Sequence, residues 1–421
     1  NHGADSNDIS GCAPTDDPTT NTFVLTQAKV LGPDGFVTFT QSQFGFTLNG
    51  AGETLYLISA DGSRILDAVQ FAAQADGVSY GRSPDGADDF YAFTARTPGT
   101  NNSAILIGNI VINELMFDPI SKDDNDQYIE LYNQGASATD LSGWQLTGGV
   151  SYSLPPGTTL AAGGYLVVAR NAAQLISHYP NLNAANCLGN FSGKLSHNGE
   201  LVMLSRPETI YTNTPIMVAE DQVTYGAGGR WGQWADGGGS SLELKNPRAN
   251  HRLAANWKDS DETRKSAWTN IEFTGTLDNG FNFDPTIDYA QIGILDTGEC
   301  LVDNVEVDDT NGVNYVSNPT FESGTNGWTF QGDHVRSSLE NSGYQSSQSL
   351  HVRASDHYFN GDDSCQVALN PNNFAAGQTA TLRFEARWLH GWPEVILRLN
   401  GGWLEATGPL PVPTDLGTPG Q

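Results

Sequence analysis

The sequence is poor in basic residues, in cysteine and in long apolar runs. The chain has only 20 lysine and arginine residues but 48 aspartate and glutamate residues, so its formal net charge is −28. Such a surface repels nucleic acid and anionic lipid, attracts divalent cations and keeps an extracellular protein soluble. No apolar run approaches the length of a membrane span, so we expect no membrane insertion. The chain shows no signal peptide and no initiator methionine, as a mature extracellular or cell-surface protein would.

Long helical patterns are missing as well, and only residues 171–178 resemble a helical turn. Glycine and proline are plentiful, and Thr, Val, Tyr and Phe recur in short runs between turn residues. This composition predicts an all-β protein. A length of 421 residues predicts about two to four domains.

A segment at the start of the chain recurs later in register. The matched residues are Asn1, Gly3, Ala4, Asp8, Ile9, Ser10 and Gly11 with Asn133, Gly135, Ala136, Asp140, Leu141, Ser142 and Gly143. In the second copy, strand-like runs at 110–116 and 128–132 come just before this segment, and the first copy begins at Asn1 without them. We therefore expect an incomplete first repeat whose open sheet edges recruit partners, including a second copy of the chain.

Short strands with alternating polar and apolar residues are predicted in both repeats. In the first repeat, residues 1–103, they lie at 23–25, 35–39, 53–58 and 66–69. In the second, residues 104–257, they lie at 110–116, 128–132, 164–168, 200–204 and 221–225. About seven short strands per unit predict two immunoglobulin-like sandwiches.

The second repeat carries a family resemblance. The motifs are Ile112-Asn113-Glu114, residues 128–133, Asp140 to Trp144, Pro156-Gly157-Thr158 and residues 163–167, and together they resemble the bacterial lamin-tail domain. Residues 81–86 and 97–99 are similar to its closing motif in the first copy, where Cys12 stands in the place of Trp144. The resemblance implies an immunoglobulin-like fold in secreted or surface-attached proteins, and it does not imply catalysis.

The C-terminal part resembles a different module. A charged stretch, 258–265, is expected to be a linker, and 414–421 a tail. Between them, in 266–413, residues 318–324 with Gly327-Trp328 resemble the first strand of a galactose-binding-like, carbohydrate-binding jelly roll, and 301–307 resemble its last strand. The last-strand motif comes first, so either two modules abut or one module is permuted. We favour a permuted jelly roll, because residues 268–307 are too few for a whole jelly roll and the segment after Trp403 lacks a second closing strand of that type.

The same resemblance implies a structural calcium ion between the first and last strands. The matching positions are Glu322 and Asp303, with Asp308 and Asp309 nearby. Carboxylate oxygens are ligands that this hard cation prefers. A second acidic loop, 118–126, lacks the glycine and terminal glutamate of an EF-hand, and we interpret it as a solvated loop.

Aromatic side chains hold sugars because the C–H face of a sugar ring is apolar. The candidate carbohydrate-binding residues are Trp388, Trp392, Trp403, Tyr358, His351 and Arg353. On a strand, Trp388 and Trp392 share parity and would present one face. The alternative is that some or all of these tryptophans belong to the core.

Signals for other chemistry are weak. Residues 77–81 match the G-x-S-x-G motif of a nucleophile elbow. Such an elbow requires a helix directly after the serine, and no helical pattern follows here. The chain has no H-E-x-x-H motif and no phosphate-binding glycine loop. Cys300 and Cys365 fall in one predicted domain and could form a disulfide, whereas Cys12 and Cys187 belong to different repeats.

These patterns favour a secreted, non-enzymatic β-sandwich protein that binds a polysaccharide or glycoprotein surface and serves adhesion. One alternative is a structural subunit of an extracellular filament or matrix, joined by strand complementation at the first repeat. Another is a set of accessory domains of a larger enzyme whose catalytic part lies outside this sequence.

Overall fold

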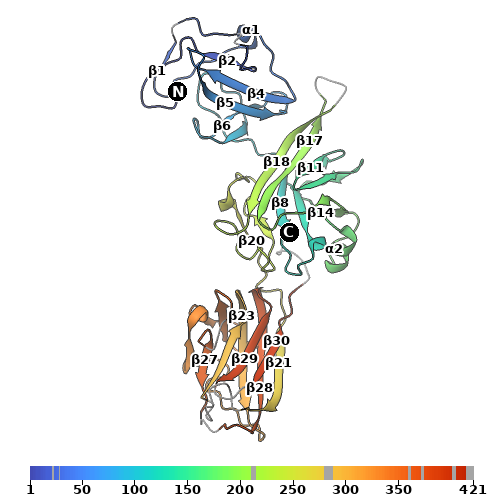
Figure 1. Ribbon diagram of the computed structural model, residues 1–421. Coiled ribbons are helices and arrows are strands. Elements are labelled where there is room, and N and C mark those ends of the chain that lie inside the picture. Colours follow the sequence, from blue (N-terminus) through green and yellow to red (C-terminus); the bar gives the residue numbers. More distant parts are fainter. Residues whose placement is uncertain are drawn as a thin grey trace.

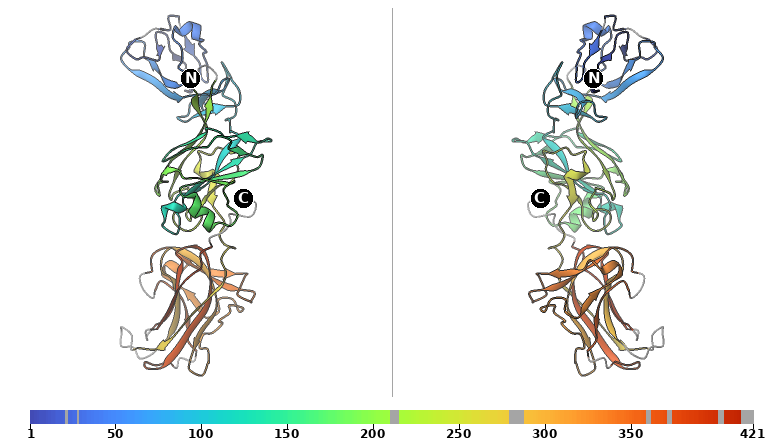
Figure 2. Two further views of the ribbon diagram at one scale, coloured as in Figure 1. Left: turned by 90° about the vertical axis from the view of Figure 1, so that its right-hand side faces the viewer. Right: turned by 90° about the vertical axis from the view of Figure 1, so that its left-hand side faces the viewer.

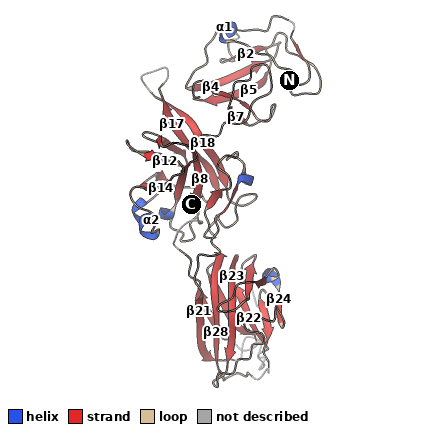
Figure 3. Ribbon diagram, turned by 180° about the vertical axis from the view of Figure 1, so that it is seen from behind, coloured by secondary structure: helices blue, strands red, loops and turns tan. Residues whose placement is uncertain are grey.

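A computed structural model describes residues 1–20, 23–27, 29–209, 215–278, 288–358, 362–370, 374–400 and 404–413. Strands dominate and helices are few, which confirms the all-β prediction (Figure 3). Three bodies follow one another, with the N-terminal unit at one end and the C-terminal sandwich at the other (Figures 1 and 2). Among the described residues, no helix is long and apolar enough to cross a membrane.

The middle sandwich has two sheets. The first has the order β15 (Cys187–Gly189), β14 (Tyr165–Ala169), β9 (Tyr128–Asn133), β8 (Ile110–Met116), β19 (Leu242–Leu244) and β20 (Trp257–Asp259). The second has the order β16 (Ser192–Gly193), β12 (Val150–Ser153), β11 (Gln145–Gly148), β17 (Gly199–Glu208) and β18 (Ile216–Gly226). A short pair, β10 (Thr139–Asp140) and β13 (Thr159–Leu160), lies beside them. All five strands predicted here are present, in an immunoglobulin-like sandwich.

The core of this sandwich lies between the two sheets. Ile112, Leu131 and Trp257 are among its fully buried side chains. On the outer face of the first sheet, helix α2 (Ala172–His178) packs Leu175 in a small cluster with residues of β14 and β15. Asn171 caps this helix by accepting a hydrogen bond from the backbone of Gln174, as its amide chemistry favours. Two 3-10 turns, η1 (Asp124–Asp126) and η2 (Ala254–Asn256), complete the unit.

Residues 258–265, expected to be a linker, instead continue this sandwich. Lys258 and Asp259 are part of β20, which pairs with β19. Ser260 and Glu262 are buried, and the hydroxyl of Ser260 donates to Glu262. The buried charge is accommodated here because Glu262 also pairs with Lys265, and Asp259 accepts from the backbone of Ala235, contacts that composition alone does not reveal.

The N-terminal unit contains one small sheet of β2 (Ala13–Thr15), β4 (Gly52–Ile58) and β5 (Ile65–Ala72). Two further pairs join β1 (Asn7–Asp8) to β3 (Val30–Leu31) and β6 (Ser79–Arg82) to β7 (Phe90–Phe93), and α1 (Gln41–Phe44) is a single turn. The strands predicted at 53–58 and 66–69 are present. Those predicted at 23–25 and 35–39 are wrong: Phe23 and Phe39 pack against each other, 5.6 Å between ring centroids, and neither segment pairs as a strand.

The sequence match between the first two units extends to their hydrogen bonds. Asp8 accepts from the backbone and hydroxyl of Ser10, and Asp140 accepts from the same two groups of Ser142. The β1–β3 pair occupies the place of the β10–β13 pair, since Asn7-Asp8 and Thr139-Asp140 are matched positions. The strand order β2-β4-β5 likewise follows β11-β17-β18.

The C-terminal sandwich has two antiparallel five-stranded sheets. One has the order β21 (Thr269–Thr276), β28 (Thr379–Gly391), β23 (Gly298–Asp308), β26 (Ser349–Ala354) and β25 (Ser338–Glu340). The other has the order β24 (Trp328–Phe330), β27 (Cys365–Ala368), β22 (Tyr289–Ile294), β29 (Glu394–Asn400) and β30 (Glu405–Pro409). A 3-10 turn, η3 (Gly332–His334), lies near β26.

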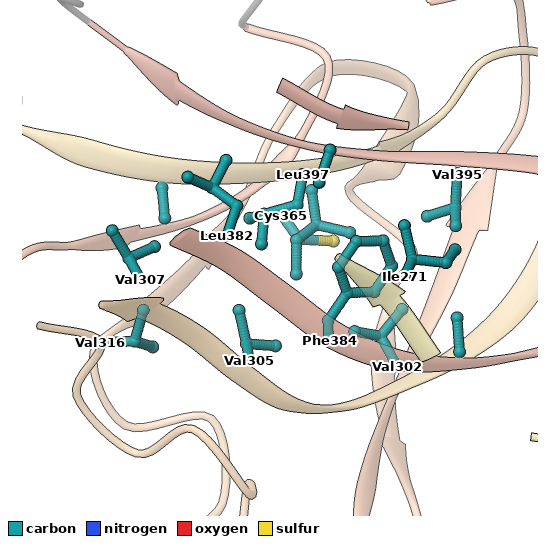
Figure 4. Packing of buried hydrophobic residues seen from close by; sticks show 14 of the residues in the cluster. Ile271, Val302, Val305, Val307, Val316, Cys365, Leu382, Phe384, Val395 and Leu397 are labelled. Carbon is teal, nitrogen blue, oxygen red and sulfur yellow. The ribbon is translucent and has the colours of Figure 1, made fainter. Parts of the chain in front are cut away.

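Both jelly-roll motifs fall in this one sandwich. The backbone N–H of Val305, in the last-strand motif, donates to the carbonyl of Pro319 in the first-strand motif, at 3.0 Å. Residues from both sheets fill a single core, part of which is drawn in Figure 4. One module therefore contains both motifs, as the permuted arrangement requires and two abutting modules would not.

The predicted disulfide is not formed. All four cysteines are free and buried, with Cys300 on β23 and Cys365 on β27 of the opposite sheet. The thiol of Cys365 lies among apolar core side chains and donates to the hydroxyl of Ser337 at 3.3 Å (Figure 4). Burial raises the pKa of the Cys365 thiol to about 12.

Candidate binding groove between the middle and C-terminal sandwiches

Trp388 is buried where the middle and C-terminal sandwiches meet. The prediction that it contacts a sugar is wrong, because its ring is not accessible. From Ala380 to Trp388, the even-numbered residues of β28 point into the core, and the Trp388 ring is fully buried among them. Its indole N–H donates to the carbonyl of Gly391 at 2.9 Å. The ring also lies against Gly239 of the middle sandwich, where an added Cβ would be 2.6 Å from it.

Trp392 faces solvent, because the strand ends between the two tryptophans. Gly391 has φ +73°, a left-handed conformation that favours glycine and turns the chain. The parity argument that placed both indoles on one face therefore fails here. The side chain of Trp392 is 42% exposed and lines a groove between the sandwiches.

The other predicted contact residues lie elsewhere. His351 and Arg353 of β26 gather around Glu299 of β23, at 2.7 Å and 3.5 Å from one carboxylate oxygen. Tyr358 packs on Gly293 of β22, in the other sheet, with the guanidinium of Arg398 over its ring at 5.2 Å. Trp403 lies outside the described residues. The predicted set therefore does not form one surface.

The groove next to Trp392 has a volume of about 680 Å³. Its lining comprises Ile120, Lys122, Gln233, Trp234, Asp236, Gly237 and Gly238 from the middle sandwich, and Asp296, Thr297, Gly391, Trp392, Pro393, Glu394 and Pro409 from the C-terminal sandwich. The backbone N–H of Gly391 donates to the carbonyl of Gly238 at 2.8 Å. The Trp234 ring stacks on His390 with 5.4 Å between centroids and 9° between planes. These contacts join the two walls of the groove.

An exposed indole and several oxygen acceptors therefore face one space. Burial, and then the nearby charge of Asp118, raise the pKa of Asp236. Lys122 pairs with Asp118 at 3.4 Å, so one basic group reaches the same rim. Sequence reasoning missed Trp234 and Asp236, because nothing local shows that residues 233–238 meet the turn after β28.

The predicted calcium ligands separate into two groups. Asp303 is buried and accepts from the backbone N–H of Tyr344 at 2.8 Å and the hydroxyl of Ser346 at 2.6 Å. Glu322 accepts hydrogen bonds from the backbone N–H groups of Ser347 and Gln348, which follow Ser346 in the same loop, at 2.9 and 2.8 Å. Both carboxylates thus hold one loop, residues 344–348.

Oxygen atoms converge beside Gly343. A Cβ at this position would lie 1.9 Å from the Ser346 hydroxyl, 2.2 Å from the Gln348 carbonyl and 2.7 Å from the Asp303 carboxylate. Oxygen donors of this kind fit calcium. No group of three His, Cys, Asp or Glu side chains with metal-binding geometry occurs in the described part of the chain, so backbone and hydroxyl oxygens would have to complete the shell.

Asp308 and Asp309 do not belong to that cradle. The Asp308 carboxylate pairs with the guanidinium of Arg383 at 2.9 Å. Asp309 accepts from the backbone of Asn311 and Val313 and closes its own turn. Their inclusion among the calcium ligands is wrong, because adjacency in the sequence places them further along β23 and in the turn after it.

Residues 104–263 match the family model of the Lamin Tail Domain. The match covers the middle sandwich and includes most of the segment that was expected to be a linker. It confirms the lamin-tail resemblance for this part of the chain. No curated protein matches the chain.

Proposed function

We propose that the protein is an extracellular or cell-surface binding protein without enzymatic activity, which holds a carbohydrate chain in the groove beside Trp392. The observation that carries the proposal is an indole, 42% exposed, inside a groove of about 680 Å³. The wall opposite belongs to a Lamin Tail Domain, so the site uses both sandwiches.

The chemistry of the groove suits a sugar. The indole offers an apolar plane for the C–H face of a ring, and such packing contributes more than its area alone suggests. Asp236, Asp296 and Glu394 supply acceptors for hydroxyl groups. With a net charge of −28, the protein repels anionic polysaccharides, so we expect a neutral ligand.

A polysaccharide pull-down with the full chain tests this proposal. Trp392→Ala should abolish retention on a neutral polysaccharide while the protein stays folded, because the side chain is exposed. Phe273→Ala is the matched control, since Phe273 is 48% exposed on β21 outside the groove. Equal retention of wild type and Trp392→Ala, or no retention on any member of a broad neutral panel, would contradict the proposal.

Calcium binding at Asp303 and Glu322 is a further part of the proposed function. The ion would bind these carboxylates and would supply a positive charge that holds the loop 343–348 to β23. It would stiffen the module that presents Trp392, and it takes part in no reaction.

A second candidate function is a structural subunit that associates through the N-terminal unit, which repeats part of the middle sandwich. The repeated hydrogen bonds of Asp8 and Asp140 support this relationship. Within the described residues β5 is an edge strand, and Ile65 and Leu66 on it are 52% and 43% exposed. Such an edge favours pairing with another strand. Sedimentation over a wide concentration range tests it, and a monomer throughout would argue against self-association.

A further inference from the structure

A row of charged side chains crosses the outer face of the six-stranded sheet. Strand register pairs Glu130 of β9 with Glu114 of β8, Glu114 with Glu243 of β19, and Glu243 with Lys258 of β20. Residues directly opposite on neighbouring strands share a face, and like charges in this position repel. Three adjacent glutamates are therefore costly unless something compensates them.

Only part of this charge is compensated by the protein. Lys258 pairs with Glu243 at 3.0 Å, and Lys265 pairs with the neighbouring Glu262 at 2.9 Å. Glu114 and Glu130 have no ion-pair partner among the described residues, although they are only 4% and 8% exposed. Burying a charge without a counter-ion is expensive, so these two are the unusual members of the row.

Both of these carboxylates line a cavity of about 310 Å³. The cavity lies beside α2 and the loop after it, and three tyrosines, Tyr128, Tyr165 and Tyr179, form part of its wall. Leu175, Leu182 and Val167 supply apolar surface. The space is separate from the groove beside Trp392, and no residue lines both.

In each carboxylate, only one of the two oxygens accepts hydrogen bonds from the described residues. The hydroxyls of Tyr128 and Ser241 both donate to Oε1 of Glu114, and the side-chain amide of Asn113 donates to Oε1 of Glu130 at 2.9 Å. No hydrogen bond within the described residues reaches Oε2 of either group, and both side chains face the cavity. Two acceptors are thus held ready at its wall.

We propose that this cavity is a binding site for an alkylammonium cation, held by the carboxylates of Glu114 and Glu130 and by the rings of Tyr128, Tyr165 and Tyr179. Aromatic faces attract organic cations, most strongly where water is excluded. Two carboxylates without a lysine partner supply the matching charge. The apolar lining favours alkyl groups on the cation over a metal ion, and the described residues offer no group of three His, Cys, Asp or Glu side chains that could hold one.

Isothermal titration of the full chain with choline tests the proposal, with the uncharged isostere 3,3-dimethyl-1-butanol as the matched ligand. Choline should bind at least about tenfold more tightly, because only it carries the charge. Phosphatidylcholine vesicles form a second arm. Binding of choline alone assigns a soluble ligand and binding of both assigns a lipid headgroup; either result supports the site. Saturable binding of neither, or equal binding of choline and its isostere, would overturn it.

The variant Glu130→Gln should weaken choline binding at least about tenfold, because it removes one charge and keeps the acceptor for Asn113. Glu208→Gln, a change on β17 outside the cavity, is the control. Burial raises the pKa of both Glu130 and Glu114, so each loses a proton when the cation binds and wild-type affinity should fall as the pH is lowered from about 9 to 6. Unchanged affinity in Glu130→Gln would refute the assignment, and neither outcome bears on the carbohydrate groove.

Discussion

The stability of the middle sandwich should fall as pH rises from about 5 to 8, and Glu130 should be a main cause. Burial, and then the neighbouring charge of Glu114, raise the pKa of Glu130 from 4.5 to about 8. In this window the folded chain holds a proton that the unfolded chain has lost. The free energy of unfolding therefore decreases with increasing pH. The stabilisation that comes from the proton on Glu130 is fully present only below the pKa that this group has in the unfolded chain.

The size of this change in stability follows from the shift in the pKa of Glu130. Ionising Glu130 in the folded state costs about 5 kcal/mol more than in the unfolded chain. Other charged groups near this carboxylate, namely Glu114, Glu243, Glu262, Lys258 and Lys265, remain in a Glu130→Gln variant. The difference between wild type and variant therefore isolates Glu130 and its coupling to these neighbours.

Urea unfolding of both full-length proteins, followed by tryptophan fluorescence at several pH values, measures this difference. Trp257 reports on the sandwich because it is buried in its core. We expect the wild type to lose several kcal/mol relative to Glu130→Gln between about pH 5 and 8, and the variant to be the more stable protein at the upper end. Parallel pH profiles for the two proteins would refute the reasoning.

Three further predictions concern the C-terminal sandwich and its junction. Trp388→Ala should destabilise it by about 3–5 kcal/mol in urea unfolding, because the ring is fully buried, whereas Trp392→Ala should change little. Gly239→Ala, at φ +96° and against the Trp388 ring, should separate the thermal transitions of the two sandwiches, and a single unchanged transition in calorimetry would count against a coupled junction. Calcium should raise the Tm of the wild type, and Asp303→Asn should remove that increase; an equal increase in both proteins would place the ion elsewhere.

The strands of the middle sandwich were predictable because their signal is local. β8 is found at the residues where alternation and composition place it, 110–116, while β9 extends its predicted run by one residue and β17 by five. The segments 23–25 and 35–39 carry the same kind of pattern and form no strands. A strand needs a continuous partner as well as a pattern. Leu25 exchanges only one pair of backbone hydrogen bonds, with Gly11 and Cys12, and neither segment forms a ladder with a described neighbour.

The site residues were less predictable. For Trp388, the sequence did carry the signal that it belongs to the core. Apolar residues alternate with polar ones along this strand and share the parity of Trp388, namely Ala380, Leu382, Phe384 and Ala386. The turn at Gly391, which sends Trp392 to the other side, carries no comparable signal. Asp303 of β23 and Glu322 accept hydrogen bonds from one loop, residues 344–348, which neither position shows in the sequence. The partner of Asp308 depends on where Arg383 of β28 lies.

The sequence by itself determined the all-β architecture and the lamin-tail character of the middle sandwich. These properties reside in alternation, turn residues and ordered motifs, each spanning a few consecutive positions. Only the tertiary structure decided that Trp392 faces a groove between two sandwiches and that Glu114 and Glu130 share a cavity in which no described lysine pairs with them. Both arrangements depend on strand register and on contacts between distant segments, and neighbouring residues in the chain do not encode them.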